Sequence, residues 1–176
     1  QRDDVLSKRY WLSIEESWDA ESYAWAQLYL ADLAMREGDE PCAERHWRNV
    51  DSEMSLWCYG QALYNLGKLE KSRANRDKAA QYWKSIKEEF GTYYPWAQLQ
   101  LGLLAYDAED FDLARHYWMN IQKAENLSVY ACAQLYLGNL EYAAQRIELA
   151  HEYWSAIEEA WSTECYAKAQ KSLSKF

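Results

Sequence analysis

Residues 94–121 read YPWAQLQLGLLAYDAEDFDLARHYWMNI, and residues 130–157 read YACAQLYLGNLEYAAQRIELAHEYWSAI. The second stretch begins 36 residues after the first and repeats its Tyr, Ala, Gly, Ala and Trp-x-x-Ile positions in order. The same pattern returns along the chain at steps of 36 residues, with one step of 35. A recurrence at this period is typical of stacked supersecondary units, none of which can bury its apolar face alone.

Ladders of equivalent residues carry the repeat. Gly67, Gly102 and Gly138 recur at one position, which Ala31 holds in the first unit. Glycine inside a helix costs about 1 kcal/mol relative to alanine, so its repeated use predicts close contact between helix backbones. The longer ladders are Trp11, Trp47, Trp83, Trp118 and Trp154; Tyr23, Tyr59, Tyr94, Tyr130 and Tyr166; and Ala26, Ala62, Ala97, Ala133 and Ala169.

The apolar spacing inside each unit is that of a helix. Residues 94–107 place Ala97, Leu101 and Leu104 on one helical face, and residues 111–123 repeat this period. Residue types that favour a helix N-cap recur at one repeat position, and strand-like alternation is absent. We therefore predict an all-α protein of about ten helices. The predicted caps are Asp19, Ser55, Gly91, Asn126 and Ser162.

The offsets between small and aromatic residues resemble the tetratricopeptide repeat. Gly102 and Ala114 lie twelve residues apart, and Trp118 follows four residues later. Segments 97–102 and 133–138 also resemble the related Sel-like repeat. The chain departs from the family at the early tryptophan position, which holds Gln27, Leu63, Gln98 and Gln134.

This resemblance covers nearly the whole chain and implies a right-handed α-solenoid of antiparallel helix pairs. Residues 1–176 would then form one repeat domain. Its parts would be a half repeat (1–18), four full repeats (19–54, 55–90, 91–125 and 126–161) and a terminal capping helix (162–176).

In the tetratricopeptide and Sel-like families the first helix of each pair lines a concave groove that binds a protein or peptide. Trp25 and Trp96 fall on this groove, but the alternative is that both side chains pack under neighbouring helices and are part of the core. The groove residues that the resemblance implies are Trp25, Leu28, Gln61, Tyr64, Lys68, Lys71, Trp96, Leu99, Leu103, Tyr106, Leu135, Asn139 and Tyr142.

A basic island interrupts an otherwise acidic sequence at residues 68–78. It contains Lys68, Lys71, Arg73, Arg76 and Lys78. It could receive an acidic segment or a C-terminal carboxylate. The alternative is a solvated turn between helices.

The overall charge disfavours two classes of partner. The chain has 19 basic and 28 acidic residues, a net charge of −9. Nucleic-acid binding and attachment to an anionic membrane surface both call for a basic surface, so we expect neither. A basic protein partner is electrostatically favoured.

Chemistry-bearing motifs are missing from the sequence. His46, His116 and His151 lie on different repeats, and there is no phosphate loop, nucleophile elbow or zinc-protease motif. We therefore expect no catalytic residues, no metal site, no cofactor and no enzymatic activity. The four cysteines form no C-x-x-C pair, which predicts reduced thiols and a cytoplasmic location. A secreted or periplasmic form whose leader was removed before Gln1 is the alternative.

The function predicted from this pattern is a scaffold that holds a protein or peptide segment in the groove, as an adaptor or co-chaperone does. The alternative hypothesis is an acidic inhibitor, such as an immunity protein, that blocks a basic toxin or enzyme. We also expect self-association through the first repeat, which begins in mid-unit and leaves apolar ladder residues uncovered.

Overall fold

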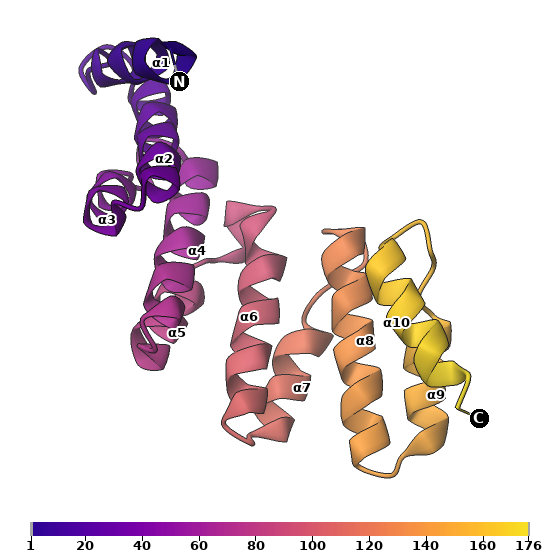
Figure 1. The fold of residues 1–176 in the computed structure, drawn as a ribbon. Helices are drawn as coiled ribbons and strands as arrows, with labels where there is room; N and C mark the ends of the chain where they lie inside the picture. The colour runs from indigo at the N-terminus through magenta and orange to yellow at the C-terminus, as the bar shows by residue number, and fades with distance from the viewer. Residues whose placement is uncertain (1, 176) are drawn as a thin grey trace. The chain divides into compact units, whose positions relative to one another are not determined.

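The computed structural model describes residues 2–175, with side chains from residue 7 onward, and every regular element in this range is a helix (Figure 1). This confirms the predicted all-α class, with helices packed in consecutive pairs. The elements are α1 (Arg2–Leu12), α2 (Ala20–Glu37), α3 (Glu40–Arg48), α4 (Leu56–Ser72), α5 (Arg76–Lys84), the 3-10 helix η1 (Glu88–Phe90), α6 (Tyr93–Asp107), α7 (Phe111–Met119), α8 (Leu127–Ala143), α9 (Ile147–Ser155) and α10 (Thr163–Leu173).

The helices fall into two compact units, residues 1–93 (unit 1) and residues 94–176 (unit 2). Unit 1 contains the pairs α2–α3 and α4–α5 and ends at Tyr93, the first residue of α6. Unit 2 contains the rest of α6 with α7, then the pair α8–α9 followed by α10. A single repeat domain over residues 1–176, and the right-handed superhelix, stay predictions. Each helix in residues 2–175 is too short or too polar to cross a lipid bilayer.

Side-chain caps start most of the longer helices. The carboxylate of Asp19 accepts a hydrogen bond from the backbone N–H of Ser22, and Ser55, Asn126 and Ser162 cap α4, α8 and α10 in the same way. The prediction that Gly91 is an N-cap is wrong, because this residue ends η1 instead. Its φ of +63° lies in the left-handed region, which glycine adopts without strain.

The tryptophan ladder forms the centre of each helix pair. Trp47, Trp83, Trp118 and Trp154 are at most 4% exposed. Each belongs to the second helix of a pair, together with a fully buried alanine one turn earlier. The ladders therefore encode the core directly. Trp11, on α1, is half-buried and lies with its ring 5.1 Å from that of Tyr29.

Candidate functional site

Unit 1 carries an aromatic face built from Trp25 on α2, Trp57 and Tyr64 on α4, and Tyr93, the last residue of the unit. The rings of Trp25 and Trp57 stack with centroids 4.6 Å apart, and Tyr93 meets the edge of Trp57 at 5.2 Å. The ring centroid of Tyr64 lies 5.9 Å from that of Tyr93. Trp25 is 44% exposed and Trp57 is 37% exposed, so the stack presents apolar surface to solvent.

The helical period explains why α4 contributes to this face. Trp57, Gln61, Tyr64 and Lys68 are spaced four, three and four residues apart, so they share one side of the helix. The Ser55 cap fixes where α4 begins and so places Trp57 in its first turn. Gln61 is half-buried in the middle of this stripe, and its Oε1 has no hydrogen-bond partner.

A cavity of about 320 Å³ lies within unit 1, where α2 and α4 pass α3. Lys68 lines this unit 1 cavity, and its Nζ stands 5.8 Å from the centroid of the Tyr64 ring, so the cavity adjoins the aromatic face. Its walls offer hydrogen-bond donors, an acidic acceptor and apolar atoms. The lining residues are Asp32, Met35, Trp47, Asn65, Lys68, Leu69 and Ser72.

Two titratable groups reflect this partly apolar setting. Burial raises the pKa of Asp32, although the charges of Arg36 and Lys68 act in the opposite direction. Burial, with the nearby charge of Asp32 as a smaller cause, raises the pKa of Tyr93 to about 12. The Tyr93 hydroxyl is therefore a neutral donor at physiological pH.

Three of the predicted groove residues belong to the core instead. Leu28, Leu99 and Leu135 are 3%, 4% and 5% exposed. Each stands three residues before the small residue of the glycine ladder, so it shares the helix side that faces the paired helix. They pack with other buried residues in the hydrophobic clusters of the two units.

The other predicted groove residues keep some exposure, and they are divided between the two units. In unit 1, Trp25 and Lys68 are exposed, while Gln61, Tyr64 and Lys71 are half-buried. In unit 2, Tyr106, Asn139 and Tyr142 are exposed, while Leu103 is half-buried and Trp96 packs half-buried against the unit's core. The structure brings Trp25 and Tyr64 together through Trp57 and Tyr93.

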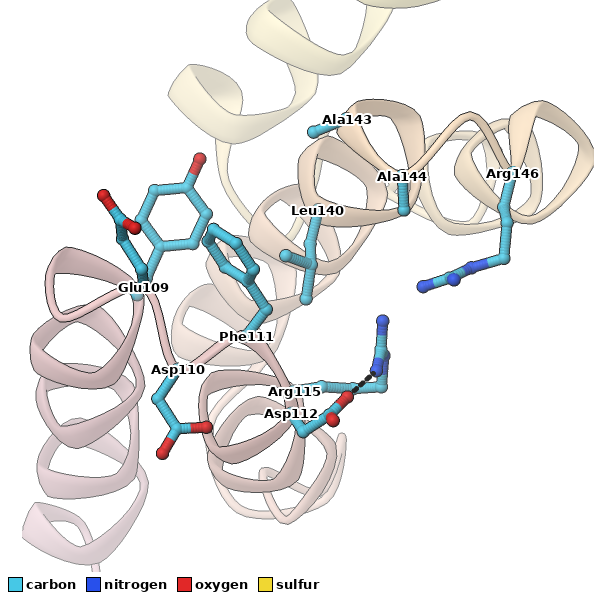
Figure 2. Close-up of a pocket in the computed structure, with 10 residues that line it drawn as sticks. Glu109, Asp110, Phe111, Asp112, Arg115, Leu140, Ala143, Ala144 and Arg146 are labelled. Carbon is cyan, nitrogen blue, oxygen red and sulfur yellow. Dashed lines mark hydrogen bonds and ion pairs between the residues drawn. The ribbon is translucent and has the colours of Figure 1, made fainter.

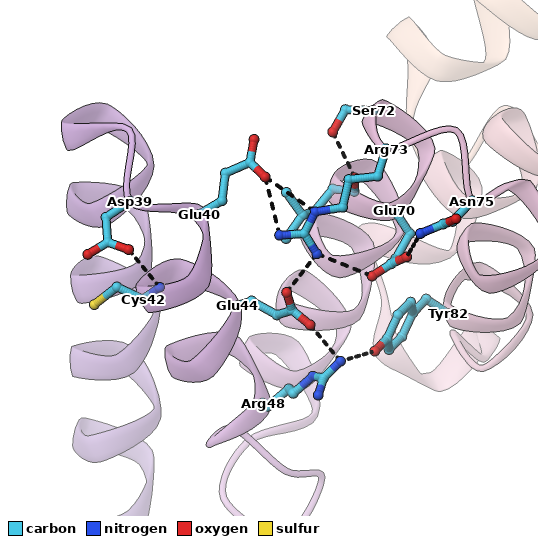
Figure 3. A network of polar contacts seen from close by, with 11 residues as sticks. Asp39, Glu40, Cys42, Glu44, Arg48, Glu70, Ser72, Arg73, Asn75 and Tyr82 are labelled. Atoms are coloured by element: carbon cyan, nitrogen blue, oxygen red, sulfur yellow. Dashed lines mark hydrogen bonds and ion pairs between the residues drawn. The ribbon is translucent and has the colours of Figure 1, made fainter.

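The basic island is tied into the fold of unit 1. The Arg73 guanidinium lies 2.7 Å from the carboxylate of Glu44, 3.2 Å from Glu40 and 3.5 Å from Glu70 (Figure 3). The Arg73 hydrogen bond lowers the pKa of Glu44. Lys71 places its Nζ 5.9 Å from the ring of Trp83. Arg73 therefore links the end of α4 to α3 rather than standing open to an acidic ligand.

Unit 2 contains a second cavity, of about 430 Å³, between the α6–α7 turn and α8 (Figure 2). The buried carboxylate of Glu141 binds Arg115 at 2.9 Å and also binds Arg146, and Arg115 reaches Asp112 at 2.9 Å. Both guanidinium groups are thus occupied by carboxylates, as Arg73 is in unit 1. The lining residues are Tyr106, Glu109, Asp110, Phe111, Asp112, Arg115, Leu140, Ala143, Ala144 and Arg146.

Sequence reasoning did not identify Trp57 and Tyr93 as part of the site. Trp57 had a usable signal, because it lies one helical turn before Gln61 on the same stripe. Tyr93 stands at the very start of α6, and its approach to α4 depends on the path of the chain around η1. Comparison of the chain with protein-family models, with curated proteins and with solved structures gave no match.

Proposed function

We propose that the protein binds a segment of a partner protein on the aromatic face of unit 1. The stacked and exposed pair Trp25–Trp57 is the observation that carries this proposal. Tryptophan buries a large area at small cost in side-chain entropy, and such residues dominate the binding energy of many interfaces. An apolar side chain of the partner would rest on the two indoles.

The unit 1 cavity supplies the polar half of the same surface. Lys68 and Asp32 there can pair with the charges or the main-chain groups of an extended segment. Because the Lys68 ammonium lies near the Tyr64 ring, one segment can contact both the aromatic face and the cavity. The partner segment we propose therefore has an apolar side chain that packs on the two indoles, next to a polar or zwitterionic residue that reaches the cavity.

The test compares the proteins captured from a cell lysate by tagged wild type and by Trp57→Ala. We expect a discrete protein to bind the wild type and to be lost with Trp57→Ala and with Trp25→Ala. Titration of that purified protein should then show binding at least about 30-fold weaker for either variant, since interface hot spots cost about 2 kcal/mol or more.

Trp18→Ala is the matched control. Trp18 is 68% exposed in the loop before α2 and is not part of the aromatic face. It should retain the wild-type partner with unchanged affinity. If Trp18→Ala and Trp57→Ala capture the same proteins as the wild type, the aromatic face is not the binding site.

The acidic inhibitor is the second candidate, and the net charge of −9 favours it. An inhibitor of this kind would bind one basic enzyme, abolish its activity and lose affinity steeply as salt rises. Binding on the aromatic face, anchored by the apolar Trp25–Trp57 stack, would lose much less affinity over the same range of salt. Titration of the captured partner at two ionic strengths separates the two functions.

A further inference from the structure

Two cysteine side chains meet in unit 2. The Sγ of Cys132, on α8, lies 2.8 Å from the Sγ of Cys165, in the first turn of α10. The two residues are 33 positions apart in sequence. A disulfide has a bond length of about 2.05 Å, so closing this thiol pair takes a movement of roughly 0.8 Å.

The surroundings keep the two sulfurs facing one another. Ser162 caps α10 through the N–H of Cys165, which fixes the first turn. Cys165 itself is 4% exposed and packs with Leu135 and Ala169 in the core between α8, α9 and α10. Cys132 is half-buried and packs against the same cluster. The packing of both helices therefore already holds the two sulfurs close to bonding distance.

We propose that Cys132 and Cys165 are a disulfide-forming pair that joins α10 covalently to α8. The co-reactant is a low-molecular-weight disulfide such as oxidised glutathione. One cysteine thiolate attacks this disulfide, forms a mixed disulfide and releases one glutathione thiolate. The second cysteine thiolate attacks the protein sulfur of the mixed disulfide and releases the second. The two protein thiols lose two electrons and two protons, and the glutathione disulfide is reduced to two thiols.

Burial makes this reaction slow at neutral pH. Desolvation, with the adjoining Cys165 as a further cause, raises the pKa of Cys132 to about 12. The thiolate is the attacking species, so the rate should increase as pH rises from 7 to 9. The same burial protects the finished disulfide from reductants.

Cys58 provides an internal comparison. It occupies in α4 the repeat position that Cys165 occupies in α10, and it too follows a serine cap. The residue of α2 equivalent to Cys132 is Trp25. Cys58 therefore has the same local setting without the second sulfur, and we expect it to stay reduced.

The test is to equilibrate the purified protein at a series of glutathione redox ratios and to alkylate the remaining thiols after an acid quench. The mass of the reduced protein should show four alkylated cysteines, and that of the oxidised protein two. Trypsin cuts after Lys123, Arg146 and Lys168, so Cys132 and Cys165 fall on different peptides that the bond would join. The oxidised form should also melt at least ~5 °C higher, because the bond closes a loop in the unfolded chain.

Cys58→Ser should retain the bond, and Cys132→Ser should abolish both the joined peptides and the redox dependence of the melting temperature. The wild-type mass measurement decides the matter even if a variant folds poorly. Four alkylated cysteines at every ratio would overturn the proposal, as would a bond that uses Cys42 or Cys58, or a bond between two chains.

Discussion

The indole nitrogen of Trp118 occupies space that a side chain on Gly102 would need: a Cβ on this glycine would stand 2.2 Å from the Trp118 Nε1. The corresponding distances are 2.3 Å for Gly67 with Trp83 and 2.4 Å for Gly138 with Trp154. Ordinary contacts of a Cβ begin near 3.4 Å. Each glycine of the ladder thus makes room for the tryptophan side chain of the paired helix, whereas the repeated use of glycine predicted contact between helix backbones.

The first helix pair shows what the glycine contributes. Trp118 donates a hydrogen bond from Nε1 to the backbone carbonyl of Leu99, at 3.4 Å. In the first pair Ala31 replaces the glycine, and the Nε1 of Trp47 is buried without a hydrogen-bond partner. A lost hydrogen bond of this kind costs about 1–3 kcal/mol.

Gly102→Ala tests this relationship. Alanine gains about 1 kcal/mol of helix propensity, but the overpacking against Trp118 costs roughly 1–3 kcal/mol and the hydrogen bond to Leu99 is lost as well. We expect a net decrease of about 1–5 kcal/mol in the free energy of unfolding, measured by urea titration followed by circular dichroism.

Trp118→Phe is the background that isolates the contact, because phenylalanine lacks the pyrrole ring and its nitrogen. There Gly102→Ala should cost less than in the wild type, or should stabilise. A higher urea midpoint for Gly102→Ala in the wild-type background would contradict the packing described here.

The sequence was informative about the core because the core is what recurs. In three of the helix pairs the ladder glycine meets the tryptophan of the second helix in the same way, so the ladders report packing directly. The candidate site does not recur. The positions equivalent to Trp57 hold Glu21, Thr92, Ser128 and Glu164, so a comparison of repeats gives no sign of the Trp25–Trp57 stack.

The misplaced groove leucines have a related cause. The resemblance to the tetratricopeptide repeat places Leu28, Leu99 and Leu135 on the groove side of their helices. Their own spacing from Ala31, Gly102 and Gly138 places them on the buried stripe. A helix that packs against neighbours on two sides has a wide apolar face. Shifting the alignment to the family by one residue therefore changes which side chains are predicted to be exposed at the edge of that face.

Trp83→Ala and Trp25→Ala should differ strongly in stability. Trp83 is 0% exposed, so its removal leaves a cavity and should cost about 3–5 kcal/mol. Trp25 is exposed and loses mainly its stacking on Trp57, worth about 0.5–1.5 kcal/mol. Urea unfolding of the two variants measures both values, and equal costs would show that the two tryptophans have been placed wrongly.

Arg73→Ala should destabilise unit 1 although the residue is on the surface. Glu70 is only 3% exposed, and the substitution removes its ion pair with Arg73. Its carboxylate would keep the hydrogen bond from the side chain of Asn75, at 2.7 Å. Weakening the partners of a buried carboxylate costs about 1–3 kcal/mol. Lys84→Ala, on the exposed side of α5, is the control and should change the free energy of unfolding by less than about 0.5 kcal/mol. The idea fails if the two variants unfold at the same urea concentration.

Glu141 should make unit 2 sensitive to acid. Burial alone would raise the pKa of its carboxyl group, but hydrogen bonds from Arg146 and Arg115 outweigh this and lower it. Because the pKa is lower in the folded than in the unfolded protein, the resulting stability is present above the unfolded value of about 4.3 and is lost as pH falls toward the folded value. Glu141→Gln removes the charge that both arginines bind, so it should lower the free energy of unfolding at pH 7 by about 1–3 kcal/mol.

The difference between wild type and Glu141→Gln should therefore shrink as the pH falls below about 4, because the wild-type carboxylate becomes protonated as well. Urea unfolding between pH 7 and pH 3 measures this difference. Glu159→Gln, in the exposed loop before α10, is the matched control and should follow the wild type throughout. A gap between wild type and Glu141→Gln that stayed constant down to pH 3 would mean that Glu141 contributes by its shape and hydrogen bonds and not by its charge.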